Sequence, residues 1–134
     1  MMRATKENPI SRPIANFWTD NEGIVHIHFK PVHNHGIEQA RTVVDVHNQL
    51  AAGGQVCILA DLQSTSSGAN REARTYYTTD EASKYKKGMA MVVRTPIQKL
   101  LGTIFVGLSR PPYPTKLFTS TEDALGWLHE IAPG

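Results

Sequence analysis

The feature of the sequence that most limits the possible folds is a short, unbroken apolar run over residues 56–60, Val-Cys-Ile-Leu-Ala. Gly53-Gly54 precedes this run and Asp61 closes it. A run without polar alternation is typical of a strand in a parallel sheet whose two faces are both covered by helices. We therefore expect a buried central strand whose carboxyl end opens into the hydroxyl-rich loop 63–68.

A second apolar run, Met89–Val93, leads directly into residues 95–98, Thr-Pro-Ile-Gln. This tetrapeptide has the form of a capping box with proline at the first helical position. The helix that it opens carries one apolar stripe at helical spacing, formed by Ile97, Leu100, Leu101, Ile104, Phe105 and Leu108. The pattern predicts a second buried strand and a helix over 97–108 that buries this stripe.

The N-terminal part of the chain has the pattern of an antiparallel hairpin. Residues 1–12 show no periodicity, so we expect them to be a flexible leader. Alternation over residues 14–29 is interrupted by the turn sequence of residues 20–23. Two alternating segments joined by a tight connection predict a pair of antiparallel strands.

The rest of the chain predicts helices that alternate with strands. Helical spacing of apolar residues predicts three further helices, over 37–51, 70–87 and 120–131. Asn34 is the expected N-cap of the helix 37–51, and Thr119 is that of the helix 120–131. Thr78-Thr79 is expected to break the helix 70–87, and a short strand is expected over 116–118. The order ββαβαβαβα predicts one α/β domain over 1–134, with a mixed, mostly parallel sheet that starts with the antiparallel hairpin.

The composition excludes several classes of protein. With 134 residues and 40% hydrophobic content, the chain can bury a core without metal or disulfide, and its single cysteine, Cys57, falls inside the buried run. A net charge of +2 does not favour nucleic acid, so Arg71, Arg74 and residues 84–87 are interpreted as solvated surface. No apolar run approaches the roughly 20 residues of a membrane-spanning helix. The polar N-terminus has no signal core, and we expect a cytoplasmic protein.

The sequence resembles the SpoIIAA-like (STAS-like) bacterial proteins. The residues that carry the resemblance are Met89–Val93, Thr95-Pro96-Ile97, Pro114–Thr119, Glu122–Leu128 and the helix Asn70–Tyr77. The resemblance covers roughly residues 14–131 and implies a SpoIIAA-like fold, which is itself similar to that of the lipid-carrier Sec14 domains. Many members of this group have no assigned activity.

One loop departs from the pattern of this group. In STAS proteins that act as anti-anti-sigma factors, a serine is phosphorylated in a short Asp-Ser-Ser-Gly-like loop after a central strand. Here the strand ends at Asp61, and Ser66-Ser67-Gly68 follows five residues later, so the match is displaced. A phosphate on Ser66 or Ser67 would add charge beside the start of a helix, which is a workable switch for a protein partner.

We expect a binding site at the carboxyl ends of the parallel strands, where the helix N-termini also point. This edge gathers acidic, hydroxyl and basic residues, namely Asp61, Ser66, Ser67, Arg71, Arg74, Arg94 and Thr95, with Thr119 and Ser120 beside them. The competing interpretation is that the hydroxyl residues only cap helices and turns. Thr95 and Thr119 are fully explained as caps.

Four histidines occur within ten positions, at His26, His28, His33 and His35. His26 and His28 share one strand face, and such a pair offers half of a zinc or nickel site. The alternative is a polar strand face followed by histidines in a loop. His47, on the apolar side of its helix, is expected to be a hydrogen-bonded, semi-buried side chain.

The sequence favours a non-enzymatic protein. No nucleophile elbow, dinucleotide-binding glycine motif or phosphate-binding loop occurs, and no cofactor is expected. The first hypothesis is a regulatory or protein-interaction module that acts through residues 61–74. The second is a domain that binds a small lipid or acyl ligand against the helix 97–108. Metal binding by the four histidines is the third, and homodimer formation through exposed Trp18 and Phe105 is a further prediction.

Overall fold

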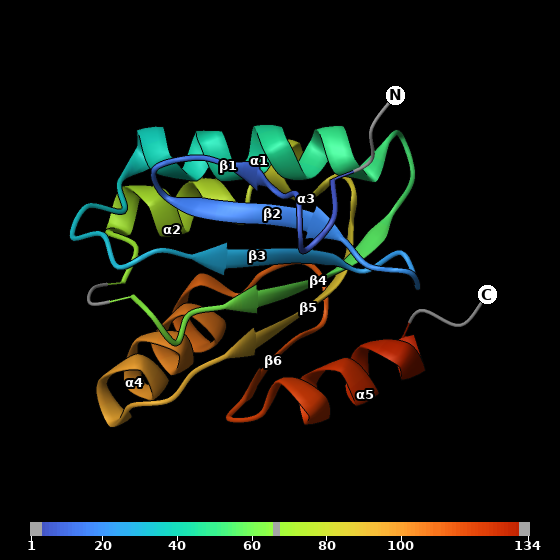
Figure 1. The fold of residues 1–134 in the computed structure, drawn as a ribbon. Helices are drawn as coiled ribbons and strands as arrows, with labels where there is room; N and C mark the ends of the chain where they lie inside the picture. Colours follow the sequence, from blue (N-terminus) through green and yellow to red (C-terminus); the bar gives the residue numbers. More distant parts are fainter. Residues whose placement is uncertain (1–3, 66–67, 132–134) are drawn as a thin grey trace.

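The computed structural model describes residues 4–65 and 68–131, which fold around one mixed sheet. The strands lie in the order in which they occur along the chain: β1 (Ile10–Ser11), β2 (Ala15–Thr19), β3 (Val25–Phe29), β4 (Val56–Asp61), β5 (Lys86–Val92) and β6 (Thr115–Phe118). The pairs from β1 to β3 are antiparallel, and the pairs from β3 to β6 are parallel (Figure 1). The predicted mixed, mostly parallel sheet with an N-terminal hairpin is therefore confirmed.

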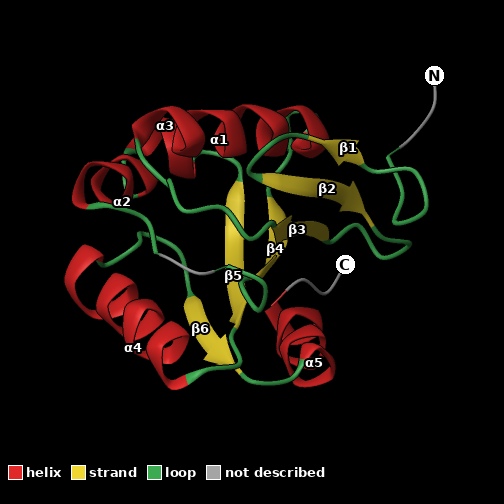
Figure 2. Cartoon of the chain, turned by 60° about the vertical axis from the view of Figure 1, so that its left-hand side comes forward, coloured by secondary structure: helices red, strands yellow, loops and turns green. Residues whose placement is uncertain are grey.

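The helices are α1 (Ile37–Ala51), α2 (Arg71–Tyr77), α3 (Asp80–Ser83), α4 (Pro96–Ile104), the π-helix η1 (Phe105–Ser109) and α5 (Thr121–Ile131). Each parallel strand from β4 to β6 lies next to the preceding strand, always toward the same edge of the sheet. Right-handed crossovers therefore place all the connecting helices on one face of the sheet. The helices α1, α2 and α4 accordingly share one face. On the other face α5 contacts β4, β5 and β6 (Figure 2).

The structure differs locally from the prediction at both ends of the sheet. Ile10 and Ser11 pair with β2, so the sheet begins within the segment that we expected to be a flexible leader. The strand β5 begins at Lys86, whereas the predicted helix extended to residue 87. The expected break in that helix is present, because Thr78 ends α2 and Thr79 caps α3.

Two of the three predicted N-caps are wrong by one or two residues. Thr95 caps α4 as expected, and its Oγ1 accepts a hydrogen bond from the Gln98 N–H at 3.1 Å. The N-cap of α1 is Gly36 and not Asn34. The Ser120 hydroxyl, not that of Thr119, accepts from the first turn of α5 at 3.2 Å. In both cases the residue at which the helix begins depends on the length of the connection from the preceding strand. The spacing of apolar residues within the helix does not predict this length.

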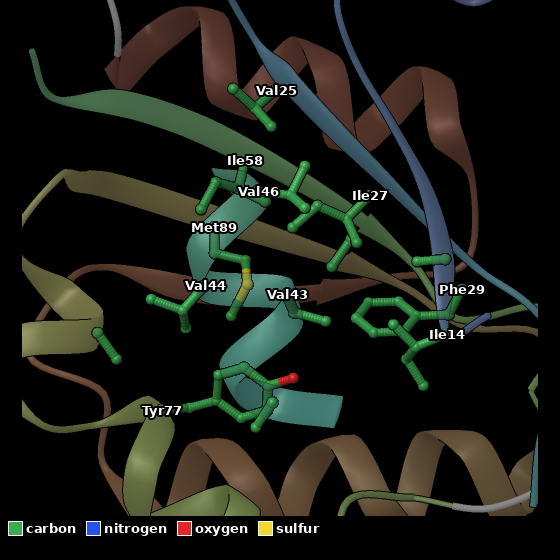
Figure 3. Packing of buried hydrophobic residues seen from close by; sticks show 14 of the residues in the cluster. Ile14, Val25, Ile27, Phe29, Val43, Val44, Val46, Ile58, Tyr77 and Met89 are labelled. Atoms are coloured by element: carbon green, nitrogen blue, oxygen red, sulfur yellow. The ribbon is translucent and has the colours of Figure 1, made fainter. Parts of the chain in front are cut away.

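The core consists of two apolar clusters, one on each face of the sheet. On the larger one, Ile27, Ile58 and Met89 point toward Val43 of α1 and Tyr77 of α2 (Figure 3). The smaller cluster packs Leu59, Ala90 and Val92 of the sheet against Ala124 and Leu128 of α5, with Cys57 buried among them as expected. Within the described part of the chain, no helix is long and apolar enough to cross a membrane.

Candidate functional site

At the carboxyl edge of the sheet, two segments meet around the buried side chain of Gln98, which the sequence presented only as part of a capping box. Its Oε1 accepts hydrogen bonds from the backbone N–H groups of Arg94 at 2.7 Å and Thr95 at 3.2 Å. Its Nε2 donates to the carbonyl oxygens of Gln63 at 2.9 Å and Thr65 at 3.1 Å. Gln98 is 8% exposed, so water competes little for these bonds. This carboxamide fastens the beginning of α4 to the loop after β4.

Other side chains that we predicted at this edge hold the backbone of the loop. The carboxylate of Asp61 accepts hydrogen bonds from the backbone N–H of Gln63 at 3.0 Å and from its side chain at 3.2 Å. Arg74 donates from Nη1 to the carbonyl oxygen of Ala69 at 2.7 Å. Both side chains therefore have a structural function, whatever else they bind.

The structure places the remaining predicted edge residues as follows. Arg71 and Arg94 are exposed, and Thr95 is occupied as a helix cap. Ser66 and Ser67 lie outside the described residues, so phosphorylation of either serine stays a prediction. The competing interpretation, in which hydroxyl groups cap helices, applies to Thr95 as expected.

His26 and His28 lie on the face of the sheet that α5 covers only in part. His26 Nε2 is 2.9 Å from Asp20 Oδ2, and its ring stacks on Trp18 with the ring centroids 5.0 Å apart. Burial opposes ionisation of Asp20, but hydrogen bonds with His26 and with backbone N–H groups hold its pKa below the ordinary value. His28 Nδ1 lies 3.9 Å from Asp61 Oδ2. These contacts describe two separate histidine–carboxylate pairs.

The structure does not bring the four clustered histidines together. His33 is exposed in the connector after β3. His35 is buried on the face of α1 and α2, opposite His26 and His28, because the chain crosses over the end of the sheet between them. Among the residues that the structure describes, no three His, Cys, Asp or Glu side chains are placed to hold a metal ion. The predicted histidine site is therefore not formed.

A cavity of about 210 Å³ lies between the sheet and the helices α1, α2 and α4. Its wall is mostly apolar and is formed by Ile27, Phe29, Val43, Ile58, Ala60, Leu62, Met89, Met91, Leu101, Ile104 and Phe105. Three of these side chains come from the segment 97–108, against which the sequence had placed an apolar ligand. The cavity lies inside the larger core cluster, next to the carboxyl edge of the sheet.

Only part of the predicted apolar stripe on this segment is buried. Ile97 is 62% exposed and Leu100 is 55% exposed, which corrects the expectation that the whole stripe packs on the core. The helix is turned so that Gly102 faces β6, where a Cβ atom would stand 2.5 Å from Cδ2 of Leu117. A larger residue at position 102 would require the Leu117 side chain to shift. The side chain of Leu108 lies outside the described residues.

The aromatic residues predicted to be exposed for homodimer formation are not free surface. Phe105 is 7% exposed and lines the cavity, where it packs edge-on against Tyr77. Trp18 is half-buried and stacks on His26. A homodimer stays a prediction, and Phe105 provides no exposed surface for it.

Two neutral polar side chains form a pair in the cavity wall. His35 Nε2 and the Tyr77 hydroxyl are joined by a hydrogen bond of 2.6 Å, and the two rings meet edge to face. Burial lowers the pKa of His35 to about 4, so the imidazole is neutral at pH 7. Burial also raises the pKa of Tyr77 well above its ordinary value, so the phenol keeps its proton. The pair therefore adds polarity to the cavity without adding charge.

Lys86, the first residue of β5, places a buried amine in the same wall. It is 6% exposed, and its Nζ lies 5.4 Å from the ring centroid of Tyr77 and 5.5 Å from that of Tyr113. No carboxylate in the described ranges pairs with Lys86, and no hydrogen-bond acceptor there contacts its Nζ. Burial lowers its pKa to about 8, so most of the amine still carries a proton at pH 7. The sequence had placed this lysine on a solvated surface, which is wrong.

Two more buried polar groups accompany this lysine. The Tyr113 hydroxyl is buried and has no hydrogen-bond partner among the residues that are described. His47 is completely buried, whereas we expected it to be semi-buried. Burial and the nearby charge of Lys86 lower the pKa of His47 to about 3, against a smaller opposing effect of the Tyr85 backbone. Buried polar groups of this kind are few in most cores, so their concentration beside one cavity marks a candidate site.

The arrangement of strands and helices matches a class of solved structures. The chain is similar to an uncharacterised protein of the DUF3478 family with a SpoIIAA-like fold from Shewanella loihica PV-4. The two share 16% sequence identity over 85% of this chain and 91% of that chain, with a TM-score of 0.61. The protein therefore has a SpoIIAA-like fold, as the sequence resemblance implied.

The sequence itself defines the family. Residues 17–132 match the family described as "Domain of unknown function (DUF7793)", and the chain belongs to this family. A protein of unknown function from Arthrobacter sp. FB24 is also similar, with 20% identity over 89% of this chain and 95% of that chain. Its TM-score is 0.33, so this match carries no argument about the fold. None of the curated proteins matches the sequence.

Proposed function

We propose that the protein binds a small apolar ligand in the cavity between the sheet and α4, and that it does so without catalysing a reaction. The cavity of about 210 Å³ is the observation that carries the proposal. Protein interiors are close-packed, and voids much larger than a water molecule are few in each domain. A mostly apolar wall with a few placed polar groups is the usual character of a ligand pocket.

The volume limits the size of the ligand. An engineered apolar cavity of about 150 Å³ binds benzene. The cavity of about 210 Å³ is larger, so it has room for a ligand with more than the six carbon atoms of benzene. An acyl chain of medium length fits, and the resemblance of SpoIIAA-like folds to the lipid-carrier Sec14 domains supports a ligand of this class.

The proposal can be tested by filling the cavity. Ala60 of β4 lines the cavity and is 4% exposed. An Ala60→Leu variant places three more carbon atoms in the space, so binding of octanoate or 1-octanol, measured by calorimetry, should weaken at least about tenfold. Thr103→Leu, which adds bulk at an exposed position of α4, is the matched control. Equal binding by the two variants, or no binding by the wild type, would contradict the proposal.

A second candidate function is a protein-interaction module. The exposed side chains of Ile97 and Leu100 lie about one turn apart on α4 and form an apolar spot. Exposed apolar groups of this size support docking of another protein or of a second copy. Sedimentation equilibrium of the wild type and of the double variant Ile97→Ser, Leu100→Ser tests self-association. A monomer in both cases would remove the homodimer from this candidate function.

A further inference from the structure

We infer that Lys86 recognises an anionic headgroup, so that the cavity takes a medium-chain carboxylate in preference to a neutral alcohol or an amine. The inference deepens the proposed function and rests on it. It names the chemical class of the ligand and the residue that selects it.

The charged side chains of the cavity wall are all positive. Lys86 and Arg74 both line the cavity, and the side chains that line it include no aspartate or glutamate. Arg74 is only partly buried, and its Nη1 is already held by the carbonyl oxygen of Ala69 at 2.7 Å. Neither cation has a carboxylate partner among the described residues, but Lys86 is only 6% exposed and its Nζ has no hydrogen-bond acceptor there. Lys86 is therefore the cation of the wall that most lacks a partner.

The surroundings of this amine stabilise a cation only in part. The faces of Tyr77 and Tyr113 attract the ammonium through cation–π contacts, with Nζ 5.4 and 5.5 Å from the ring centroids. Such contacts do not replace the hydrogen bonds that an ammonium makes in water, so a buried, unpaired charge is costly unless a partner is supplied. A carboxylate at the end of a bound acyl chain would supply both the opposite charge and the acceptors.

The neighbouring Tyr113 hydroxyl points to the same ligand chemistry. Its oxygen is buried without a partner in the described parts of the chain, and its ring flanks the ammonium. Lys86, which lines the cavity, and Tyr113, whose ring lies against it, thus carry polar hydrogens for which the described residues provide no acceptor. A carboxylate is acceptor-only and accepts several hydrogen bonds, whereas an alcohol offers fewer acceptor sites and an ammonium offers none.

The test compares three ligands of the same length. Octanoate, 1-octanol and octylammonium are titrated at pH 7 into the wild type, Lys86→Met and Lys87→Met. Met has nearly the length of Lys without its charge, and Lys87 is the exposed neighbour in the same strand. We expect the wild type and Lys87→Met to bind octanoate about tenfold to a hundredfold more tightly than octanol, as for a charged hydrogen bond. Octylammonium should bind most weakly, and Lys86→Met should bind octanoate and octanol alike.

The outcomes separate the inference from the proposed function. Equal affinity of the wild type for octanoate and octanol would overturn the inference and leave the proposed function standing, whereas absence of binding by either would end both. A preference for octanoate that persists in Lys86→Met, or that disappears in Arg74→Gln instead, would overturn the role of Lys86. The wild-type comparison needs no variant, so it decides the ligand class even if Lys86→Met does not fold.

Discussion

The two faces of the sheet differ in what they bury. The part of the sheet that α5 covers presents apolar side chains such as Leu59, Ala90 and Val92, which pack against Leu128 of the helix. The opposite face buries larger side chains together with Lys86, His35, His47 and two tyrosines, next to a cavity. Apolar burial raises stability, whereas buried ionisable groups lower it. The difference indicates that the α5 face stabilises the fold, and that the cavity face gives up stability in the way that binding sites commonly do.

If this comparison holds, acid should destabilise the protein through the cavity face, and this is the largest effect that we expect. The pKa of His35 is about 4 in the folded protein and about 6.5 when unfolded. The unfolded chain therefore binds the proton first as the pH falls. The stabilising contribution of the neutral imidazole is complete above pH 6.5 and is lost between pH 6.5 and 4. Urea unfolding across this range should show a decrease of about 3 kcal/mol from His35 alone.

Substitution of the second buried histidine sharpens this prediction. His47, with a pKa of about 3, adds to the same loss, so His47→Leu should make the free energy of unfolding depend less on pH below 6.5. Identical pH dependence in the wild type and His47→Leu would show that the buried imidazole is not the cause.

Removing the buried amine should stabilise the protein without ligand. The pKa of Lys86 is about 8 in the folded protein and about 10.4 in the unfolded chain. The neutral amine therefore contributes fully to the stability of the fold above about pH 10.4, and this contribution is lost as the pH falls toward 8. At pH 7 Lys86→Met should therefore raise the free energy of unfolding by up to about 3 kcal/mol. Guanidinium unfolding measures the change, with Lys87→Met as the control. A loss of stability would mean that the ammonium is satisfied in the folded protein.

Adding the same bulk to each face should separate a cavity from a packed core. Ala60 of β4 and Ala90 of β5 lie on neighbouring strands and point to opposite faces. Ala90→Leu overfills the core beneath α5 and should destabilise by about 1–3 kcal/mol. Ala60→Leu extends into empty space, so it should change the stability by less than about 1 kcal/mol. Thermal and urea unfolding of both variants measure this, and equal destabilisation would argue against a cavity beside Ala60.

The smallest effect is expected outside both faces. Ile97 and Leu100 are more than half exposed, so replacing both with serine should change the free energy of unfolding by less than about 0.5 kcal/mol at each site. Octanoate binding should be retained, because these side chains do not line the cavity. A large loss of stability would show that the outer side of α4 is packed in solution.

The strands β2 to β6 and the capping box at Thr95 were predictable because their signals are local, whereas the short β1 fell in the segment expected to be a flexible leader. Val56–Ala60 has no polar residue to place toward water, and Thr95 with Gln98 satisfies the first turn of α4 from within four residues. The orientation of α4 was not predictable, because its apolar stripe is wider than the face that a helix at the edge of the sheet can bury. Gly102 of α4 lies against Leu117 of β6, and such a contact between two separate elements has no signal in the local sequence.

The candidate site was predicted only in outline. An apolar pocket against residues 97–108 followed from the apolar stripe, but Lys86 stood among Lys84 and Lys87, where charge patterning indicates solvent. Its burial depends on Tyr77 and Tyr113, which reach it from two distant parts of the chain. Such a placement is tertiary and leaves no local signal.

Gln98 has a consequence for how the chain can vary over evolutionary time. Its single carboxamide accepts from two backbone N–H groups and donates to two carbonyl oxygens. Glutamate at this position would turn an acceptor oxygen toward the carbonyl groups of Gln63 and Thr65, and an apolar residue would leave all four backbone groups unsatisfied. We expect drift at position 98 to be confined to amides, while its exposed neighbour Lys99 changes freely.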